Sequence, residues 1–226
     1  MFPRRGCGRL IFRQAGLLRQ EESRKKNPER TERHARVRII AGNLRGRKVA
    51  APPGRGTRPM LDRVREALFN ILQPRLPGAL VWDLFAGSGA LGLEALSRGA
   101  GKAFFVERNK QVLALLERNL QALLGKDKEE TTLLVGGDAW DPPLPKEPPP
   151  DLVFLDPPYA QVGGDPFLLR ERVLALRRRL APGGLLVFHY PASLPEAAGA
   201  LEGMEGRRRT WGTSTIAFLP SLEEEP

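Results

Sequence analysis

Beyond Gly78, short apolar runs alternate with stretches that carry the spacing of amphipathic helices, and this alternation limits the possible folds more than any other feature. Such alternation is typical of β-α-β units, in which helices connect the strands of a parallel sheet. We predict helices over residues 90–98, from the cap Asn109 to Gly125, and over residues 167–180. We predict strands over residues 79–84, 102–107, 131–135, 151–155 and 185–190, and two more near 207–211 and 215–219. The chain is therefore expected to be an α/β protein with a mostly parallel sheet.

A different pattern precedes this region. Residues 37–50 have the alternation and the glycine-containing turn of a small hairpin. We expect a helix to follow, with Asp62 as its N-cap. Its apolar stripe is predicted to hold Val64, Leu68, Ile71 and Leu72, whereas Arg63, Arg65 and Glu66 are predicted to point elsewhere. The predicted organisation is a basic extension (1–36), the hairpin and helix (37–77), the α/β domain (78–220) and an acidic tail (221–226).

The basic residues are concentrated near the N-terminus. The chain carries a formal net charge of +10 at pH 7. Residues 1–36 hold 11 Lys and Arg against four Glu, and residues 37–75 hold nine against two acidic residues, so the rest of the chain is net acidic. A basic segment beside a mildly acidic body is typical of proteins that bind a polyanion. Nucleic acid is therefore the expected partner, and a solvated tail is the alternative.

Composition excludes several other classes of protein. With 41% apolar and 27% charged residues, the profile is globular. Cys7 is the single cysteine, so it has no partner for a disulfide within the chain, and no Cys/His pattern indicates a metal site. No apolar run approaches the ~20 residues that span a bilayer, and the N-terminus lacks the apolar core of a signal peptide. We therefore expect a cytoplasmic protein without a metal or a membrane partner.

Residues 1–36 contain few apolar residues and are not expected to fold alone. Two interpretations remain open for them. They could form a basic arm that adds affinity for RNA without specificity. They could also lie upstream of the true start, because a valine codon at Val37 can serve as a bacterial start. We favour the second interpretation, and the intact mass of the protein from its native source would decide between them.

The first chemical motif is Asp83-Leu84-Phe85-Ala86-Gly87-Ser88-Gly89-Ala90-Leu91-Gly92, where the first predicted strand turns into a helix. Its glycines at 87, 89 and 92 match a nucleotide-binding fingerprint, in which glycine lets a ligand touch the backbone. Glu107 ends the next strand, 15 residues beyond Gly92, where a carboxylate can accept hydrogen bonds from ribose hydroxyls. The motif indicates an adenosine-containing cofactor, either a nicotinamide dinucleotide or S-adenosylmethionine. A turn that serves packing alone is the alternative.

The second motif is Asp156-Pro157-Pro158-Tyr159, directly after the apolar run 152–155 and therefore at the carboxyl edge of the predicted sheet. Its two prolines lack N–H donors, so the segment offers carbonyl acceptors. The Asp156 carboxylate and a proline carbonyl can accept the two N–H bonds of a nucleobase amino group, and Tyr159 can stack on the base. The alternative is a loop that merely ends a strand, with Asp156 as a cap.

Residues 37–219 resemble the bacterial guanine-N2 methyltransferases that modify 16S ribosomal RNA. The resemblance rests on the two motifs above and on the segments Arg38-Ile39-Ile40-Ala41-Gly42, Gly46-Arg47-Lys48, Arg58-Pro59 and Asp62 to Asn70. It implies a Rossmann-like class I methyltransferase fold, with a seven-stranded sheet and helices on both faces, and S-adenosylmethionine as the cofactor. Met60-Leu61 and Trp211-Gly212 depart from the family pattern, and residues 1–36 match nothing in it.

The resemblance also implies roles for individual residues. Asp83, Gly87 and Gly89 would line the methionine end of the cofactor, Glu107 would hold its ribose, and Asp138 would reach its adenine amino group. Phe85 and Ala139 complete the expected cofactor site, and the residues expected to act on the base are Asp156, Pro157, Pro158 and Tyr159. The residues expected to contact RNA are Arg38, Arg45, Arg47, Lys48, Arg58, Arg63 and Arg65. The implied partner is 16S ribosomal RNA within an assembling small ribosomal subunit, with the protein as a monomer.

Three rival functions remain to be weighed. A nicotinamide-dependent oxidoreductase would explain the glycine turn but not the second motif, and a non-enzymatic RNA-binding assembly factor would explain the charge but neither motif. A DNA adenine or cytosine amino-methyltransferase is the closest rival, although it normally needs an additional target-recognition segment. His189 is interpreted as a packed or hydrogen-bonded residue rather than a catalyst.

Overall fold

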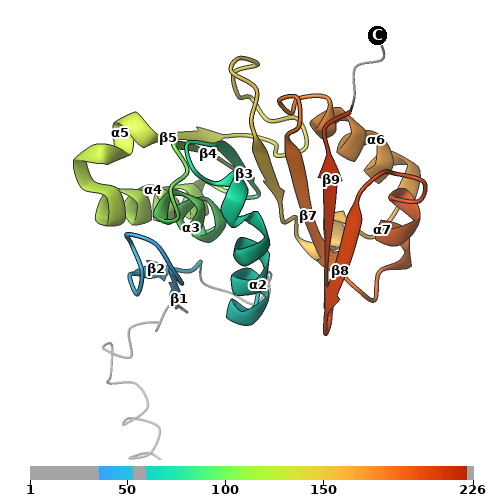
Figure 1. The fold of residues 1–226 in the computed structure, drawn as a ribbon, viewed down its shortest axis with the longest axis horizontal. Helices are drawn as coiled ribbons and strands as arrows, with labels where there is room; N and C mark the ends of the chain where they lie inside the picture. The colour runs from blue at the N-terminus through green and yellow to red at the C-terminus, as the bar shows by residue number, and fades with distance from the viewer. Residues whose placement is uncertain (1–35, 53–59, 223–226) are drawn as a thin grey trace, which may run out of the picture. The chain divides into compact units, whose positions relative to one another are not determined.

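Seven strands form one sheet in the order β5-β4-β3-β6-β7-β9-β8 (Figure 1). The computed structural model describes residues 36–52 and 60–222. The strands of the sheet are β3 (Leu80–Leu84), β4 (Lys102–Glu107), β5 (Thr132–Gly136), β6 (Leu152–Leu155), β7 (Leu185–Pro191), β8 (Arg207–Trp211) and β9 (Ser214–Pro220). Strands β5, β4, β3, β6 and β7 run parallel, whereas β9 runs antiparallel to both of its neighbours. The predicted mostly parallel, seven-stranded sheet is confirmed.

Helices cover both faces of this sheet (Figure 1). One face packs against α2 (Asp62–Leu72), α3 (Ala90–Ser97) and α4 (Lys110–Leu124), and the other against α6 (Pro166–Arg177) and α7 (Pro195–Ala200). Side chains alternate along each strand, so that Phe154 enters the first core and Val153 the second. The remaining short helices are η1 (Gln73–Arg75), η2 (Gly125–Asp127), α5 (Lys128–Thr131) and η3 (Tyr159–Gln161). Two separate apolar cores therefore sandwich the sheet.

Local signals explain where the long helices begin and end. The side chain of Asn109 accepts hydrogen bonds from the backbone N–H groups of Gln111 and Val112, at 2.9 and 3.2 Å, and so caps α4 as predicted. Gly125, with φ of 59°, follows the last residue of α4. Asp165 caps α6 by accepting from the N–H of Phe167 at 2.9 Å. These caps satisfy backbone groups that a helix leaves unpaired at its ends.

The hairpin joins β1 (Arg36–Arg38) to β2 (Lys48–Ala50) and packs into the same core as α2, α3 and α4. The backbone of Gly42 touches α3 so closely that a Cβ there would lie 1.6 Å from the carbonyl oxygen of Ser97. The side-chain amide of Asn119 in α4 bonds both the N–H and the carbonyl of Ala50, at 3.1 and 2.9 Å. The hairpin therefore shares one apolar core with the helices on this face of the sheet.

Two expectations about α2 are wrong. Asp62 is the first residue of the helix and not its N-cap; Leu61 precedes it, without a side-chain cap. Arg65 does not point away from the core: it is 2% exposed, whereas Ile71 is 37% exposed. The Arg65 guanidinium donates to the carbonyl oxygen of Arg38 at 2.5 Å and to the Asp62 carboxylate at 3.1 Å. Burial is tolerated because these two acceptors replace water around the cation.

Some expectations lie outside the described residues. These are the basic extension except for Arg36, the predicted RNA contact Arg58, and the end of the acidic tail from residue 223. Within the described ranges, no helix is long and apolar enough to cross a membrane.

Candidate active site

The two sequence motifs meet at the carboxyl edge of the sheet. Strands β4 and β6 lie on opposite sides of β3, so the strand order reverses at β3, and ligands of open α/β sheets bind where such a reversal occurs. Leu84 at the end of β3 pairs in register with Leu155 at the end of β6. The next residues along the two strands are Phe85 and Asp156. Strand pairing thus brings together two segments that are far apart in the sequence.

The glycine turn after β3 has an unusual backbone. Phe85 has φ of 60°, which is rare for a residue with a side chain, and Gly87 and Gly89 have φ of 54° and 81°. The N–H of Gly87 donates to the carboxylate of Glu107 at 3.1 Å, which ties the turn to the end of β4. Gly89 lies against α4, where a Cβ would be 2.4 Å from a methyl carbon of Leu116. A side chain at position 89 would have to adopt a rarely populated φ and displace the end of the Leu116 side chain, so glycine is favoured there even without a ligand.

The carboxyl group of Asp83 is buried and has a raised pKa. Its side chain is 2% exposed, and one oxygen accepts a hydrogen bond from the N–H of Gly92 at 2.9 Å. Burial raises the pKa of Asp83 to about 8, and the nearby charges of Asp156 and Glu107 add to this rise, although the Gly92 bond opposes it. At neutral pH the Asp83 carboxyl is therefore mostly protonated in the absence of ligand.

The larger of two adjoining cavities, of about 420 Å³, lies between the ends of β3, β4 and β5. That volume is typical of small-molecule sites. Its lining includes five residues that were predicted to bind the cofactor: Phe85, Gly87, Glu107, Asp138 and Ala139. Carboxylates at the ends of two neighbouring strands can accept hydrogen bonds from hydroxyl and amino groups, while the apolar side chains can cover a planar ring.

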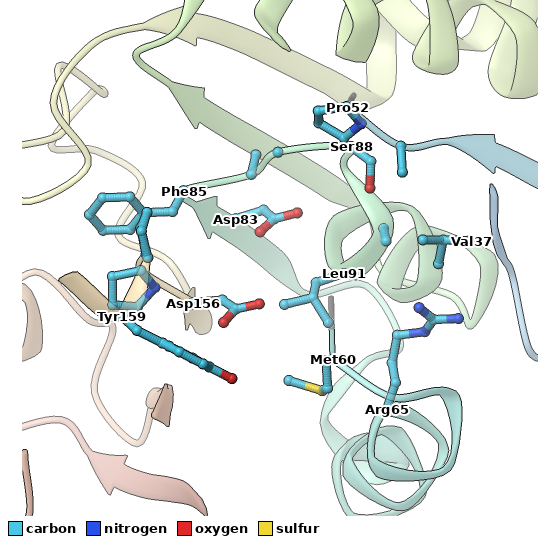
Figure 2. Close-up of a pocket in the computed structure, with 16 residues that line it drawn as sticks. Val37, Pro52, Met60, Arg65, Asp83, Phe85, Ser88, Leu91, Asp156 and Tyr159 are labelled. Carbon is cyan, nitrogen blue, oxygen red and sulfur yellow. The ribbon is translucent and has the colours of Figure 1, made fainter. Parts of the chain in front are cut away.

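The smaller cavity, of about 120 Å³, is lined by Asp83 and by all four residues of the second motif. Figure 2 shows the side chains of Asp83, Asp156 and Tyr159 directed into it, with Met60 and Leu91 on the opposite wall. The two cavities share Pro52, Phe85, Gly87, Asp156 and Pro158. The two cavities therefore adjoin each other along the residues that they share.

Asp156 has a partner that sequence reasoning did not assign. Its side chain is 29% exposed, and one carboxylate oxygen lies 2.8 Å from Nδ1 of His189, which is 2% exposed. The interpretation of His189 as a hydrogen-bonded residue is thus confirmed. Its closeness to Asp156 could have been inferred only from the pairing of β6 with β7.

Trp140 and Gln161 were also missed. The indole N–H of Trp140 donates to Gln161 at 3.0 Å, and its ring packs edge-on against Phe85 with 5.2 Å between centroids. Trp140 thereby contacts two residues that line the larger cavity. The sequence offered one indication of its place, because Trp140 follows the predicted adenine contact Asp138 by two residues. The Asp138 carboxylate accepts a hydrogen bond from the backbone N–H of Trp140 at 3.0 Å.

The hairpin contributes to the lining of the site, and it carries several exposed basic side chains. Val37, Ala51 and Pro52 line the smaller cavity, so both ends of the hairpin reach it. The exposed basic residues among those predicted to contact RNA are Arg38, Arg45, Arg47, Lys48 and Arg63. Arg65 does not belong to this exposed surface, because it is buried between α2 and the hairpin. Among the described residues, no group of His, Cys, Asp or Glu is arranged to hold a metal ion.

The strand order decides the class of protein. A seven-stranded sheet in which β9 alone runs against its neighbours, with helices on both faces and ligand cavities beside β3, is the Rossmann-like fold of the class I methyltransferases. The chain belongs to the family described as Conserved hypothetical protein 95, whose model matches residues 37–219.

Known relatives agree with this assignment. The chain is 46% identical over 123 residues to Ribosomal RNA small subunit methyltransferase D of Escherichia coli strain K12, and this match covers 54% of the chain and 60% of that relative. It is 32% identical over 184 residues to the putative rRNA methyltransferase YlbH of Bacillus subtilis, covering 80% and 97% of the two chains. The solved structure of putative methyltransferase yhhF from Escherichia coli superposes with a TM-score of 0.66 at 33% identity, covering 84% of this chain and all of that one.

Proposed function

We propose that this protein transfers a methyl group from S-adenosylmethionine to the exocyclic N2 of a guanine in 16S ribosomal RNA. One observation carries the proposal: Asp156 and Pro158 line both of two adjoining cavities, one suited to an adenosine cofactor and one to a planar base. The family relatives that are named as ribosomal RNA methyltransferases support the same reaction and substrate class.

The larger cavity suits the cofactor. Glu107 is placed to accept hydrogen bonds from ribose hydroxyls, and Asp138 from the adenine amino group. The glycine turn lets the cofactor approach the backbone at Gly87. Asp83, at the boundary of the smaller cavity, would face its methionine end. When bound, S-adenosylmethionine supplies a methyl group on a sulfonium, which needs no further activation.

The smaller cavity suits the acceptor base. The N2 lone pair of guanine is delocalised into the ring, so the nitrogen is a weak nucleophile that gains from hydrogen bonds accepted by Asp156 and by a carbonyl of Pro157 or Pro158. Tyr159, 39% exposed, can stack on the base once it is splayed out of the RNA. As the N–C bond forms and the C–S bond breaks, the electron pair of the latter stays on sulfur, and N2 then loses a proton to Asp156 or to water.

Positioning accounts for most of the expected rate enhancement. The residues hold two reactants in contact and supply no strong base, and such alignment is worth roughly 7–11 kcal/mol in favourable cases. The exposed basic residues of the hairpin and of the start of α2 would hold the phosphates around the target guanine. In this proposal residues 37–77 contact RNA and residues 78–220 bind the cofactor. The protein would act in the cytoplasm as a monomer, on RNA of an assembling small subunit.

The test combines binding and product analysis. Calorimetry should detect binding of S-adenosylmethionine and no binding of NAD(H). Asp138→Ala should weaken the binding of S-adenosylmethionine by about 1.5–3 kcal/mol, because a hydrogen bond to a charged group is lost. Small ribosomal subunits, naked 16S RNA and DNA are then incubated with the protein and the cofactor, and their nucleosides are analysed by mass spectrometry. N2-methylguanosine in RNA is expected. NAD(H) binding without S-adenosylmethionine binding, or methylated bases in DNA alone, would overturn the proposal.

A further inference from the structure

His189 and Asp156 are neighbours because of strand pairing. In the parallel ladder of β6 and β7, Leu155 pairs with Phe188, so the next residue on each strand is Asp156 and His189. Phe154, two residues before Asp156, lies in the core beneath α2, and so does Ile216, which pairs with His189. Side chains on a strand alternate between faces, so both residues point to the same side of the sheet. The contact is therefore built into the register of the sheet.

A histidine at position 189 is unfavourable for the stability of the fold. It lies in a strand that is otherwise apolar, between Phe188 and Tyr190, and is 2% exposed. Its Nε2 is buried and has no hydrogen-bond partner among the described residues. A buried polar atom without a partner destabilises a fold, and an apolar side chain of similar size would avoid that cost. Packing alone therefore does not explain a histidine at this position.

The geometry defines which hydrogen bond His189 makes. Nδ1 lies 2.8 Å from Oδ1 of Asp156, and an ionised carboxylate can only accept. We assign the proton to Nδ1, because this tautomer donates to Asp156 and leaves only a lone pair at the buried Nε2. With Oδ1 held, rotation of the carboxylate is restricted, and Oδ2 is the oxygen that remains to accept from a bound amino group.

We propose that His189 is a positioning residue, which holds the Asp156 carboxylate in the orientation that accepts a hydrogen bond from the amino group of the target base. This inference rests on the proposed function. It does not require His189 to touch either reactant, since Nδ1 acts through Asp156 and the ring is buried. A hydrogen bond that aligns a group in the transition state should affect kcat more than cofactor binding.

The test replaces His189 with three side chains. His189→Phe keeps a ring of similar size but cannot donate, and it should lower kcat about tenfold to a hundredfold, with cofactor affinity and KM for RNA changed by less than about threefold. The amide nitrogen of His189→Asn can take the position of Nδ1 and should recover most of the rate. His189→Gln places its amide nearer the position of Nε2 and should recover much less. Thermal unfolding will show whether the Phe variant folds. If it does not, the comparison of the Asn and Gln variants tests the proposal.

A double-mutant cycle separates positioning from a merely structural role. In an Asp156→Ala background, His189→Phe should have little further effect, because the acceptor that it orients is already gone. An equal loss of kcat in both backgrounds, or a folded His189→Phe variant with the original kcat, would overturn the inference while leaving the proposed function intact. If the unsubstituted protein transfers no methyl group, both this inference and the proposed function are overturned.

Discussion

Glu94, which is fully buried in α3, accepts a hydrogen bond from the backbone N–H of Ile40 at 2.7 Å. Its second carboxylate oxygen accepts from the N–H of Ala41 at 3.1 Å and from Arg98 at 2.7 Å. One side chain thus fixes the hairpin to the helix that follows the glycine turn.

Glu94→Ala should lower the free energy of unfolding by about 3–5 kcal/mol, because it leaves a buried guanidinium and two backbone donors without their acceptor. Urea denaturation measures this change. Glu94→Gln is the matched control, since it keeps one acceptor oxygen and most of the volume, and it should cost clearly less. A loss below about 1 kcal/mol for the Ala variant would mean that water replaces the carboxylate easily.

Two glycines of the hairpin offer a matched pair. Gly42 and Gly46 both have φ of 81°, but a Cβ at Gly42 would lie 1.6 Å from Ser97, whereas nothing lies within 4 Å at Gly46. Gly46→Ala should cost about 1–2 kcal/mol from backbone strain alone. Gly42→Ala should cost at least about 1–3 kcal/mol more from overpacking, because the obstacle is backbone. Equal destabilisation in chemical denaturation would show that the hairpin does not press against α3 in solution.

Asp83 should make stability depend on pH. Its pKa is raised from 3.8 to about 8 by burial, so between these values the unfolded chain has released a proton that the folded protein retains. The contribution of Asp83 to stability is therefore complete below about pH 4 and declines until about pH 8. The difference in unfolding free energy between the original protein and Asp83→Asn should follow this decline and level off above pH 8. A difference that does not change with pH would contradict the raised pKa.

Salt dependence should locate the RNA. Replacing Arg47 and Lys48 with Ala should weaken RNA binding and reduce the slope of log affinity against log salt by about 0.7–0.9 for each phosphate that the protein no longer neutralises. Lys102 and Lys126 form a control pair, because both are exposed basic residues of the α/β region. Their replacement should leave the slope nearly unchanged, because they lie outside residues 37–77, the segment proposed to contact RNA. Similar slopes for both pairs of variants would place the RNA elsewhere.

Local patterns in the sequence were sufficient to predict most of the secondary structure. The strand over residues 102–107 has the predicted ends, and Asn109 caps α4 as expected, because apolar alternation and helix capping depend on residues close together in the chain. The two chemical motifs were recognisable for the same reason, because each directly follows a predicted strand. Residue roles drawn from the family resemblance remain predictions.

Contacts between distant segments were decided by the tertiary structure alone. Arg65 was expected on the surface because helical spacing places it off the apolar stripe, but the hairpin covers it and supplies the Arg38 carbonyl. His189 and Asp156 are 33 residues apart, and only the register of β6 with β7 makes them partners. Buried polar groups of this kind are stabilised by acceptors and donors from other elements, and no periodicity within one element encodes where those elements pack.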